Sequence, residues 1–259
     1  MVNSLVPVVS QMNLTDSEVR FYNQEGYLPL PGFVRAEAVA GLRQEVFDVL
    51  EANGILPERL RHASSSADKL RQMSQYLVGS KLDALINGSE TLAIAGRLIG
   101  GRACRYLPFT AVKSGGGGGM FDFHQDNNYT IHEPALGSIN IWVALVDMTP
   151  ENGCLQIIPR SHLKGQINSR GSDDGDGHQR IDVAMIDCMP MRMRAGDAVA
   201  FTRWTVHGSG PNQTAEARVA YALQYHREDV KWRDGDQWRP LVETPKWATP
   251  PVSKLGATT

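Results

Sequence analysis

Three residues with metal-binding side chains stand out in the sequence. His124 and Asp126 are separated by one residue in "MFDFHQDNNYT", and His207 follows an apolar run in "GDAVAFTRWTVHGSG". If His124 and Asp126 lie on one strand, the period of two places both on the same face. Two imidazoles and one carboxylate are the donor set of the facial triad of non-haem Fe(II) sites, which leaves coordination positions open for a chelating co-substrate and O₂. A His-x-Asp pair alone is a weak signal, since most histidines are structural or solvated.

A chelating anion would need a counter-charge near the metal. Arg218 opens the next apolar run, "RVAYALQYH", and a guanidinium binds a carboxylate through two parallel hydrogen bonds. Ser209 could add a hydroxyl to the same carboxylate. The alternative readings are a solvated arginine at a strand end and a serine that only shapes a turn.

Composition limits the classes of protein. The 259 residues are 42% hydrophobic and carry a net charge of −2, so no polybasic tract indicates nucleic acid or a membrane surface. No apolar run approaches the roughly 18 residues of a membrane span, and the N-terminus lacks the cationic start of a signal peptide. The three cysteines, Cys104, Cys154 and Cys188, are an odd number without a CxxC pair. This pattern argues against a disulfide framework and predicts a cytoplasmic protein.

The first hundred residues predict helices. Thr15 and Glu18 have the spacing of a capping box at a helix start. A second helix is predicted by the apolar stripe Val39, Leu42, Val46 and Leu50, with Gly54 placed to end it. A third stretch, "SETLAIAGRLIGG", ends at paired glycines.

From about residue 103 the sequence predicts strands. Short runs rich in β-branched and aromatic residues alternate with turn residues, which is typical of an all-β sandwich or barrel. The predicted strands lie near residues 103–113, 139–147, 154–158, 183–188, 198–203 and 218–226. The polar loop 166–181 is long enough to be a lid that sets specificity, whereas the glycine run 115–119 reads as a connecting linker.

The order of these motifs resembles the phytanoyl-CoA dioxygenase family of Fe(II)/2-oxoglutarate-dependent oxygenases. The matching segments are "FYNQEGYLPLPGFV", "FHQDNNY", "INIWVALVDMTPENGCLQIIPRSHLKG", "MRAGDAVAFTRWTVHGSGPNQT" and "ARVAYALQYH". The resemblance implies an all-β core with flanking helices, a double-stranded β-helix of the cupin-like jelly-roll type. Residues 1–259 would then form one domain, with a helical part at about 14–100, a jelly-roll core at about 103–228 and an extended tail.

The resemblance also implies roles for particular residues. His124, Asp126 and His207 would bind Fe(II), and Arg218 and Ser209 would bind the 2-oxoglutarate carboxylate. Two aromatic residues match positions beside the co-substrate, although both could equally be core residues: Trp142 and Phe109. Lys113 matches a lysine common on the strand before the metal motif. The family's halogenating relatives lack the metal carboxylate, so the presence of Asp126 favours hydroxylation.

The substrate is the least certain part of the prediction. Four residues are expected to face it: Lys113, Asn127, Asn128 and Tyr129. Four arginines could supply charge for an anionic substrate: Arg105, Arg192, Arg194 and Arg203. Arg160 stands in "IPRSH" where the family usually has glycine, which affects a turn and no catalytic group.

The sequence therefore predicts an Fe(II)/2-oxoglutarate-dependent dioxygenase that uses O₂ to hydroxylate a small polar molecule or natural-product intermediate. It would be a monomer or homodimer, with neither nucleic acid nor membrane as a partner. Two other classes remain open. One is a non-catalytic jelly-roll protein that binds a metal or ligand, and the other is a zinc hydrolase, because two histidines and a carboxylate also suit catalytic zinc.

Overall fold

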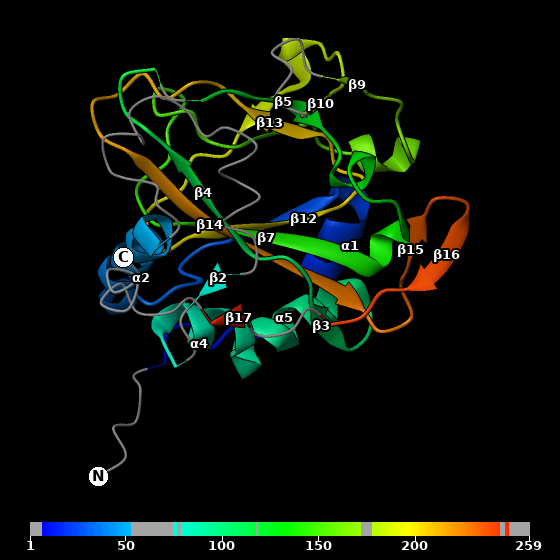
Figure 1. Cartoon of the computed structure of the whole chain (residues 1–259), viewed down its shortest axis with the longest axis horizontal. Coiled ribbons are helices and arrows are strands. Elements are labelled where there is room, and N and C mark those ends of the chain that lie inside the picture. The colour runs from blue at the N-terminus through cyan, green and yellow to red at the C-terminus, as the bar shows by residue number, and fades with distance from the viewer. Residues whose placement is uncertain are drawn as a thin grey trace, which may run out of the picture.

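Two antiparallel sheets face each other, and helices cover the outer side of the larger one (Figure 1). The structure, a computed structural model, describes residues 7–52, 75–76, 79–117, 119–171, 178–243 and 247–248. Within these residues no helix is both long and apolar enough to cross a bilayer.

The larger sheet has six strands. In order, they are β1 (Tyr27–Leu30), β12 (Ala198–Thr202), β7 (Ser138–Ala144) and β14 (Arg218–Arg227), with β3 (Ala103–Arg105) and β4 (Phe109–Lys113) both beside β14. β14 is the longest strand and pairs with β7 on one side along most of its length. It is therefore a central strand of the sheet, which pairs with β7 on one side and with β3 and β4 on the other.

The smaller sheet faces it with four strands. They are β11 (Met189–Pro190), β8 (Gln156–Ile157), β13 (His207–Ser209) and β5 (Phe121–His124), in that order. Two facing antiparallel sheets of this kind form the predicted jelly roll. Short strands complete the structure: β6 (His132–Glu133), β15 (Lys231–Asp234) and β16 (Gln237–Pro240) form one sheet, β9 (Arg170–Gly171) pairs β10 (Gln179–Arg180), and β2 (Gln75–Tyr76) pairs β17 (Trp247–Ala248).

Three of the four helices that the structure describes were predicted from the sequence, and α4 was not. They are α1 (Asp16–Glu25), α2 (Ala36–Ala52), α4 (Lys81–Asn87) and α5 (Ser89–Ile99). At α1, Thr15 Oγ1 accepts from Glu18 N at 3.2 Å and Glu18 Oε2 accepts from Thr15 N at 2.7 Å, so the capping box is confirmed. Gly54 lies outside the described residues. α5 ends at Gly100, whose φ of 70° is the left-handed conformation that favours glycine.

Alternation along β14 separates two hydrophobic layers. Tyr221 and Leu223 point to the helices, where they pack in one cluster with residues such as Leu42 of α2 and Leu85 of α4. Ala220 and Ala222 point instead into the space between the sheets. Because alanine is small, this inner face leaves room for the polar side chains described below.

The β-strand predictions are confirmed at four positions and corrected at two. The strand predicted at 103–113 is two strands, β3 and β4, with a break that includes Pro108, which has no amide hydrogen for a ladder. The segment predicted as a strand at 183–188 contains a 3₁₀ turn, Met185–Asp187, and the strand begins only at Met189. Ile186 there is 93% exposed, so its β-branched side chain has no sheet face to pack on. The organisation of residues 1–259 as one domain with an extended tail stays a prediction.

Candidate metal centre

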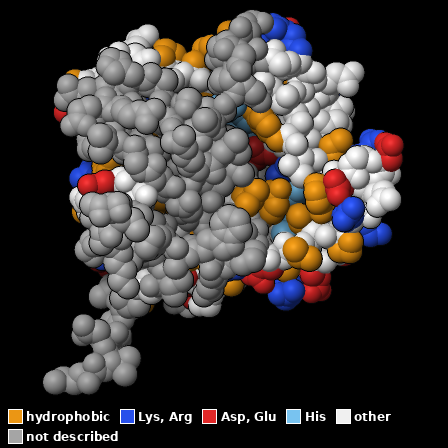
Figure 2. All heavy atoms as spheres, viewed as in Figure 1, with side chains coloured by type: hydrophobic (Ala, Val, Ile, Leu, Met, Phe, Trp, Pro, Cys, Tyr) orange, Lys and Arg blue, Asp and Glu red, His pale blue; other side chains and the backbone are white. Residues whose placement is uncertain are grey.

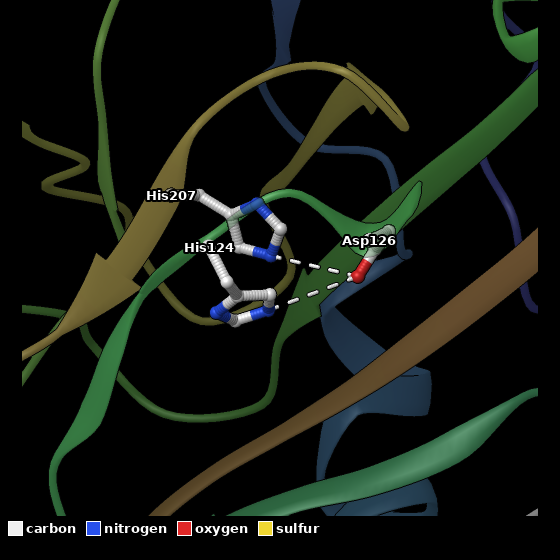
Figure 3. A group of neighbouring side chains, drawn as sticks. All are labelled: His124, Asp126 and His207. Atoms are coloured by element: carbon white, nitrogen blue, oxygen red, sulfur yellow. Dashed lines mark ion pairs between the residues drawn. The ribbon is translucent and has the colours of Figure 1, made fainter. Parts of the chain in front are cut away.

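The three predicted ligands come together between the two sheets (Figure 3). His124 ends β5 and His207 opens β13, and the two residues are antiparallel partners in the smaller sheet. Asp126 opens a 3₁₀ turn, Asp126–Asn128, rather than continuing the strand. The expectation that the two-residue period of a strand aligns His124 with Asp126 was therefore wrong: the turn after β5 brings the carboxylate back to the imidazoles.

The geometry of the three side chains fits one metal ion. Asp126 Oδ1 lies 3.9 Å from His124 Nε2 and 3.8 Å from His207 Nε2. Metal bonds to such donors are about 2.0–2.2 Å long, so one ion bridges atoms up to about 4.4 Å apart. All three residues are buried. An ion bound by these three residues would be shielded from bulk water by the surrounding protein.

The hydrogen bonds of the rings also suit metal binding. His124 Nδ1 lies 2.7 Å from Asp122 O, and His207 Nδ1 lies 3.0 Å from Thr205 O. A carbonyl only accepts, so we assign the proton to Nδ1 in both rings. Each Nε2 then carries its lone pair, and both Nε2 atoms lie within 4 Å of Asp126 Oδ1. Backbone carbonyls behind histidine ligands fix the tautomer in this way in metal proteins.

The far end of the same cavity carries a buried cation. Arg218 is 2% exposed, and its Nε has no hydrogen-bond partner among the described residues. Its guanidinium lies 5.1 Å from the centre of the Trp142 ring. Burial lowers the pKa of Arg218 to about 9. A buried, unpaired charge is costly, so this position is suited to an anion.

The cavity joins the metal ligands to Arg218. Its empty space is about 480 Å³, including the part open to solvent. The wall is formed by the three ligands and by Phe109, Ala111, Phe121, Asn140, Trp142, Leu155, Phe201, Gly208, Ser209 and Arg218. Figure 2 looks onto a face where hydrophobic side chains border a hollow in which charged and histidine atoms are visible. The predicted co-substrate residues Ser209, Trp142, Phe109 and Arg218 thus lie in one cavity with the metal ligands.

Lys113 lies at the arginine end of the cavity. It is the antiparallel partner of Arg218, is fully buried, and donates to Ser209 O at 3.3 Å and to Gly210 O. Burial, followed by the charge of Arg218, lowers the pKa of Lys113 to about 6. Its ammonium is tied to the strand that carries His207, so a direct contact of Lys113 with substrate stays a prediction.

The residues after the metal motif hold a neighbouring loop. Asn127 Nδ2 donates to Gln166 Oε1 at 2.8 Å, and Asn128 Nδ2 donates to Ile167 O at 2.9 Å. Both amides are therefore engaged within the chain, and their contact with substrate stays a prediction. Tyr129 is 41% exposed, and its ring packs edge-on against the His124 ring at 5.2 Å. Of the three residues, Tyr129 is the one that combines exposure with contact to a ligand.

The loop predicted as a lid is fastened to the metal motif at both ends. At its start, Gln125 Nε2 donates to Gly165 O at 2.8 Å, and Ile167 N donates to Gln125 Oε1 at 2.8 Å. At its end, Ile181 N donates to Phe123 O at 2.6 Å. Residues 172–177 lie outside the described part, and the lid function stays a prediction.

Sequence reasoning missed one polar contact of the Asp126 side chain and one of its backbone. Asn140 Nδ2 donates to Asp126 Oδ2 at 3.4 Å from β7, and Arg203 bonds the turn that carries Asp126. Asn140 lies two residues before Trp142 and so shares its face, which was the available signal. Of the arginines considered for an anionic substrate, Arg203 alone lies beside the centre: Arg105 bonds Asn87 on the helix side, and Arg192 and Arg194 are exposed.

Comparison with known proteins agrees with this geometry. The family model described as Phytanoyl-CoA dioxygenase (PhyH) matches residues 22–220. Methylphosphonate hydroxylase of Gimesia maris is 29% identical over 82% of this chain and 81% of its own length. L-proline trans-4-hydroxylase of Streptomyces griseoviridis is 27% identical over 83% of this chain and 87% of its own length. Among solved structures, the non-heme alpha-ketoglutarate-dependent carbocyclase SnoK from nogalamycin biosynthesis has a TM-score of 0.68 at 23% identity, covering 88% of this chain and 94% of its own. The last similarity shows the jelly-roll fold.

Proposed function

Because the chain belongs to the phytanoyl-CoA dioxygenase family and is an iron- and 2-oxoglutarate-dependent oxygenase, we propose that it hydroxylates a C–H bond of a small polar molecule, with release of succinate and CO₂. One observation carries the proposal. A triad of two imidazoles and a carboxylate shares a cavity with a buried arginine that lacks a described partner for its Nε. The triad suits Fe(II), and the arginine suits a dicarboxylate that also reaches the metal.

Different residues of the chain would bind the metal, the co-substrate and the substrate. His124, Asp126 and His207 would hold the iron, and the two Nδ1–H groups bonded to carbonyls keep both rings in the metal-binding tautomer. Bound iron, with 2-oxoglutarate and O₂, supplies an oxidant able to attack an unactivated C–H bond. The chain's part is to place that bond and to exclude water from it.

The far carboxylate of 2-oxoglutarate would lie on Arg218. Its guanidinium offers two parallel donors, and Ser209 on β13 adds a hydroxyl from the same cavity wall. Trp142 and Phe109 form apolar sides of that wall, so water is excluded and the ion pair is strengthened. Arg218 thereby fixes the orientation in which the other end of the co-substrate meets the metal.

The substrate is small, or enters the cavity only in part. The cavity beside the metal ligands must hold both the co-substrate and the reacting group of the substrate. Two relatives over most of their lengths are named for small polar substrates, methylphosphonate and L-proline. We propose that Tyr129, which is exposed and packs against the His124 ring, contacts the substrate. Three unpaired cysteines agree with the predicted cytoplasmic location, where this enzyme would act as a monomer or homodimer.

The other readings explain less of the site. A zinc hydrolase or a non-catalytic metal protein needs the triad alone, and neither uses an arginine buried at the far end of the cavity. The presence of Asp126 at the third ligand position favours hydroxylation over halogenation.

Succinate formation tests the proposal. Purified protein with Fe(II), ascorbate and 2-oxoglutarate is incubated with methylphosphonate, L-proline and a panel of small carboxylates and phosphonates, and succinate and hydroxylated product are measured together. We expect at least one compound to give the two products in equal amounts, and Asp126→Ala to give neither. Metal-dependent hydrolysis of an ester or amide by the zinc-loaded protein, without any succinate with iron, would contradict the proposal.

A further inference from the structure

We propose that Arg203 is a positioning residue of the metal centre: it locks the turn that carries Asp126 onto the segment that carries His207, and thereby sets the affinity for the metal. The inference rests on the metal centre of the proposed function. It adds a residue that makes no contact with metal or co-substrate and that the sequence analysis considered only as a source of charge for substrate.

Arg203 bonds three residues of the turn and of the segment that follows it. Its Nη2 donates to Asp126 O and to Thr130 O, each at 2.8 Å. Its Nε donates to Asn127 Oδ1 at 3.3 Å. The rigid fork of the guanidinium thus spans the turn from the metal ligand to its end, which a single point charge cannot do.

Residues at the turn also donate hydrogen bonds to the segment that carries Arg203. Asn127 N donates to Arg203 O at 3.2 Å, and Gln125 Nε2 donates to Trp204 O at 2.6 Å. Arg203 and Trp204 lie in the turn between β12 and β13, and His207 is the first residue of β13. The two segments that carry Asp126 and His207 are therefore cross-braced by hydrogen bonds in both directions.

The brace is made by a buried charge. Arg203 is 4% exposed, and no described carboxylate lies within ion-pair distance of it. Its acceptors are two backbone carbonyls and one amide oxygen, and its guanidinium lies 5.8 Å from the centre of the Tyr106 ring. Burying a cation that has only neutral acceptors costs folding free energy.

The consequence is a metal site that is organised before the metal binds. Asp126 Oδ1 lies 3.8 Å from His207 Nε2, so the brace holds the two ligands at a separation that one metal ion can bridge. Without the brace, metal binding would also have to order the turn, and the metal affinity would be lower. Removing groups that orient metal ligands costs about 10- to 100-fold in metal affinity in other sites.

The test uses Co(II) as the metal probe, in the absence of oxygen. Wild type, Arg203→Met and Arg203→Lys are titrated, and the Kd is read from the visible absorption of bound Co(II), whose band shape also reports the ligand geometry. Arg105→Met is the matched control, because Arg105 is also a buried arginine but bonds Asn87 and Glu243 away from the centre. The thermal midpoint of each apoprotein is measured alongside.

We expect Arg203→Met to raise the Co(II) Kd by about tenfold or more and to change the band shape. Arg203→Lys keeps the charge but loses the fork, so its Co(II) Kd should lie between that of wild type and that of Arg203→Met. If Arg203→Met does not fold, the Kd of Arg203→Lys decides the test. Arg105→Met should lower the apoprotein midpoint and leave the Kd unchanged. A wild-type Kd in both Arg203 variants, or an equal loss in Arg105→Met, overturns the inference while the metal centre stands. If wild type binds no Co(II), the metal centre and the inference fall together.

Discussion

Replacing Arg218 by methionine should weaken 2-oxoglutarate binding and, at the same time, stabilise the apoprotein. Arg218 is buried with an unpaired Nε, and burial lowers its pKa to about 9, against roughly 12.5 for an arginine in water. One pKa unit corresponds to about 1.4 kcal/mol, so the charge costs the folded apoprotein on the order of 4–5 kcal/mol at pH 7.

The sign follows from the direction of the pKa change. Since the folded pKa lies below the unfolded one, the penalty is complete at any pH below about 9 and is lost as the pH rises further. Methionine removes the charge and keeps much of the apolar stem. The lost interaction with the Trp142 ring offsets about 0.5–2 kcal/mol of the gain. A net gain of about 2–4 kcal/mol should raise the apoprotein midpoint by roughly 5 °C or more.

Co-substrate binding should change in the opposite direction. Removing one partner of a buried, hydrogen-bonded charge pair costs about 2–5 kcal/mol, which is at least about 30-fold in Kd. The assay combines calorimetry of the apoprotein with anaerobic titration of the Fe(II) protein by 2-oxoglutarate. Arg105→Met, a change at a buried arginine away from the cavity, should show the reverse pattern: lower stability and an unchanged Kd. Wild-type affinity in Arg218→Met would refute the co-substrate assignment, and a fall in its apoprotein stability would refute the unpaired charge.

Three further changes test other parts of the structure. Asp126→Ala should abolish iron-dependent turnover while the fold is retained, as checked by succinate release and circular dichroism; turnover above a few per cent of wild type would remove Asp126 from the ligand set. Arg160→Gly should stabilise the protein by about 0.5–1 kcal/mol, because Arg160 has a φ of 64°; a lower denaturation midpoint would contradict this. Gly26→Ala should destabilise by several kcal/mol, because Gly26 has a φ of 81° and a Cβ there would lie 2.3 Å from His162 Nδ1; an unchanged midpoint would show that this corner is loose.

The elements with a regular pattern were predictable from the sequence. The stripe of Leu42, Val46 and Leu50 gives α2, because a period of 3.6 residues puts them on one buried face. The donor set of the metal centre was also accessible, because His207 adds a second imidazole to the weak His-x-Asp signal and the order of these motifs resembles that of the family. The position of Asp126 was predicted for the wrong reason, since a 3₁₀ turn and not a strand brings it to the histidines.

A one-residue shift explains why Arg105 was misplaced. Lys113 faces Arg218 and Phe109 faces Ala222 across the sheet, which by continuation would put Arg105 opposite His226 on the cavity side. The structure pairs Arg105 with Tyr225 instead. The break between β3 and β4 shifts the register by one residue, and such a shift turns every side chain to the other face.

Contacts between loops left no signal in the sequence. Arg203 on the turn after β12 and Gln125 beside the ligands donate to backbone carbonyls far along the chain. The amide of Asn127 accepts a bond from Arg203 and donates one to the side chain of Gln166. Hydrogen bonds of this kind have neither a period nor a residue-type signature, because any backbone carbonyl can accept. The structure was therefore needed to show which residues support the metal ligands by hydrogen bonds.

The most direct test of the central claim is optical and anaerobic. Fe(II) is added to the purified apoprotein, followed by 2-oxoglutarate, and the weak visible charge-transfer band of the chelate is recorded for wild type and His207→Ala. The assignment predicts a band that appears only when both components are present and that is absent in His207→Ala. Tight binding of zinc with no band from iron and 2-oxoglutarate would contradict it, and the site would then be a metal centre of another kind.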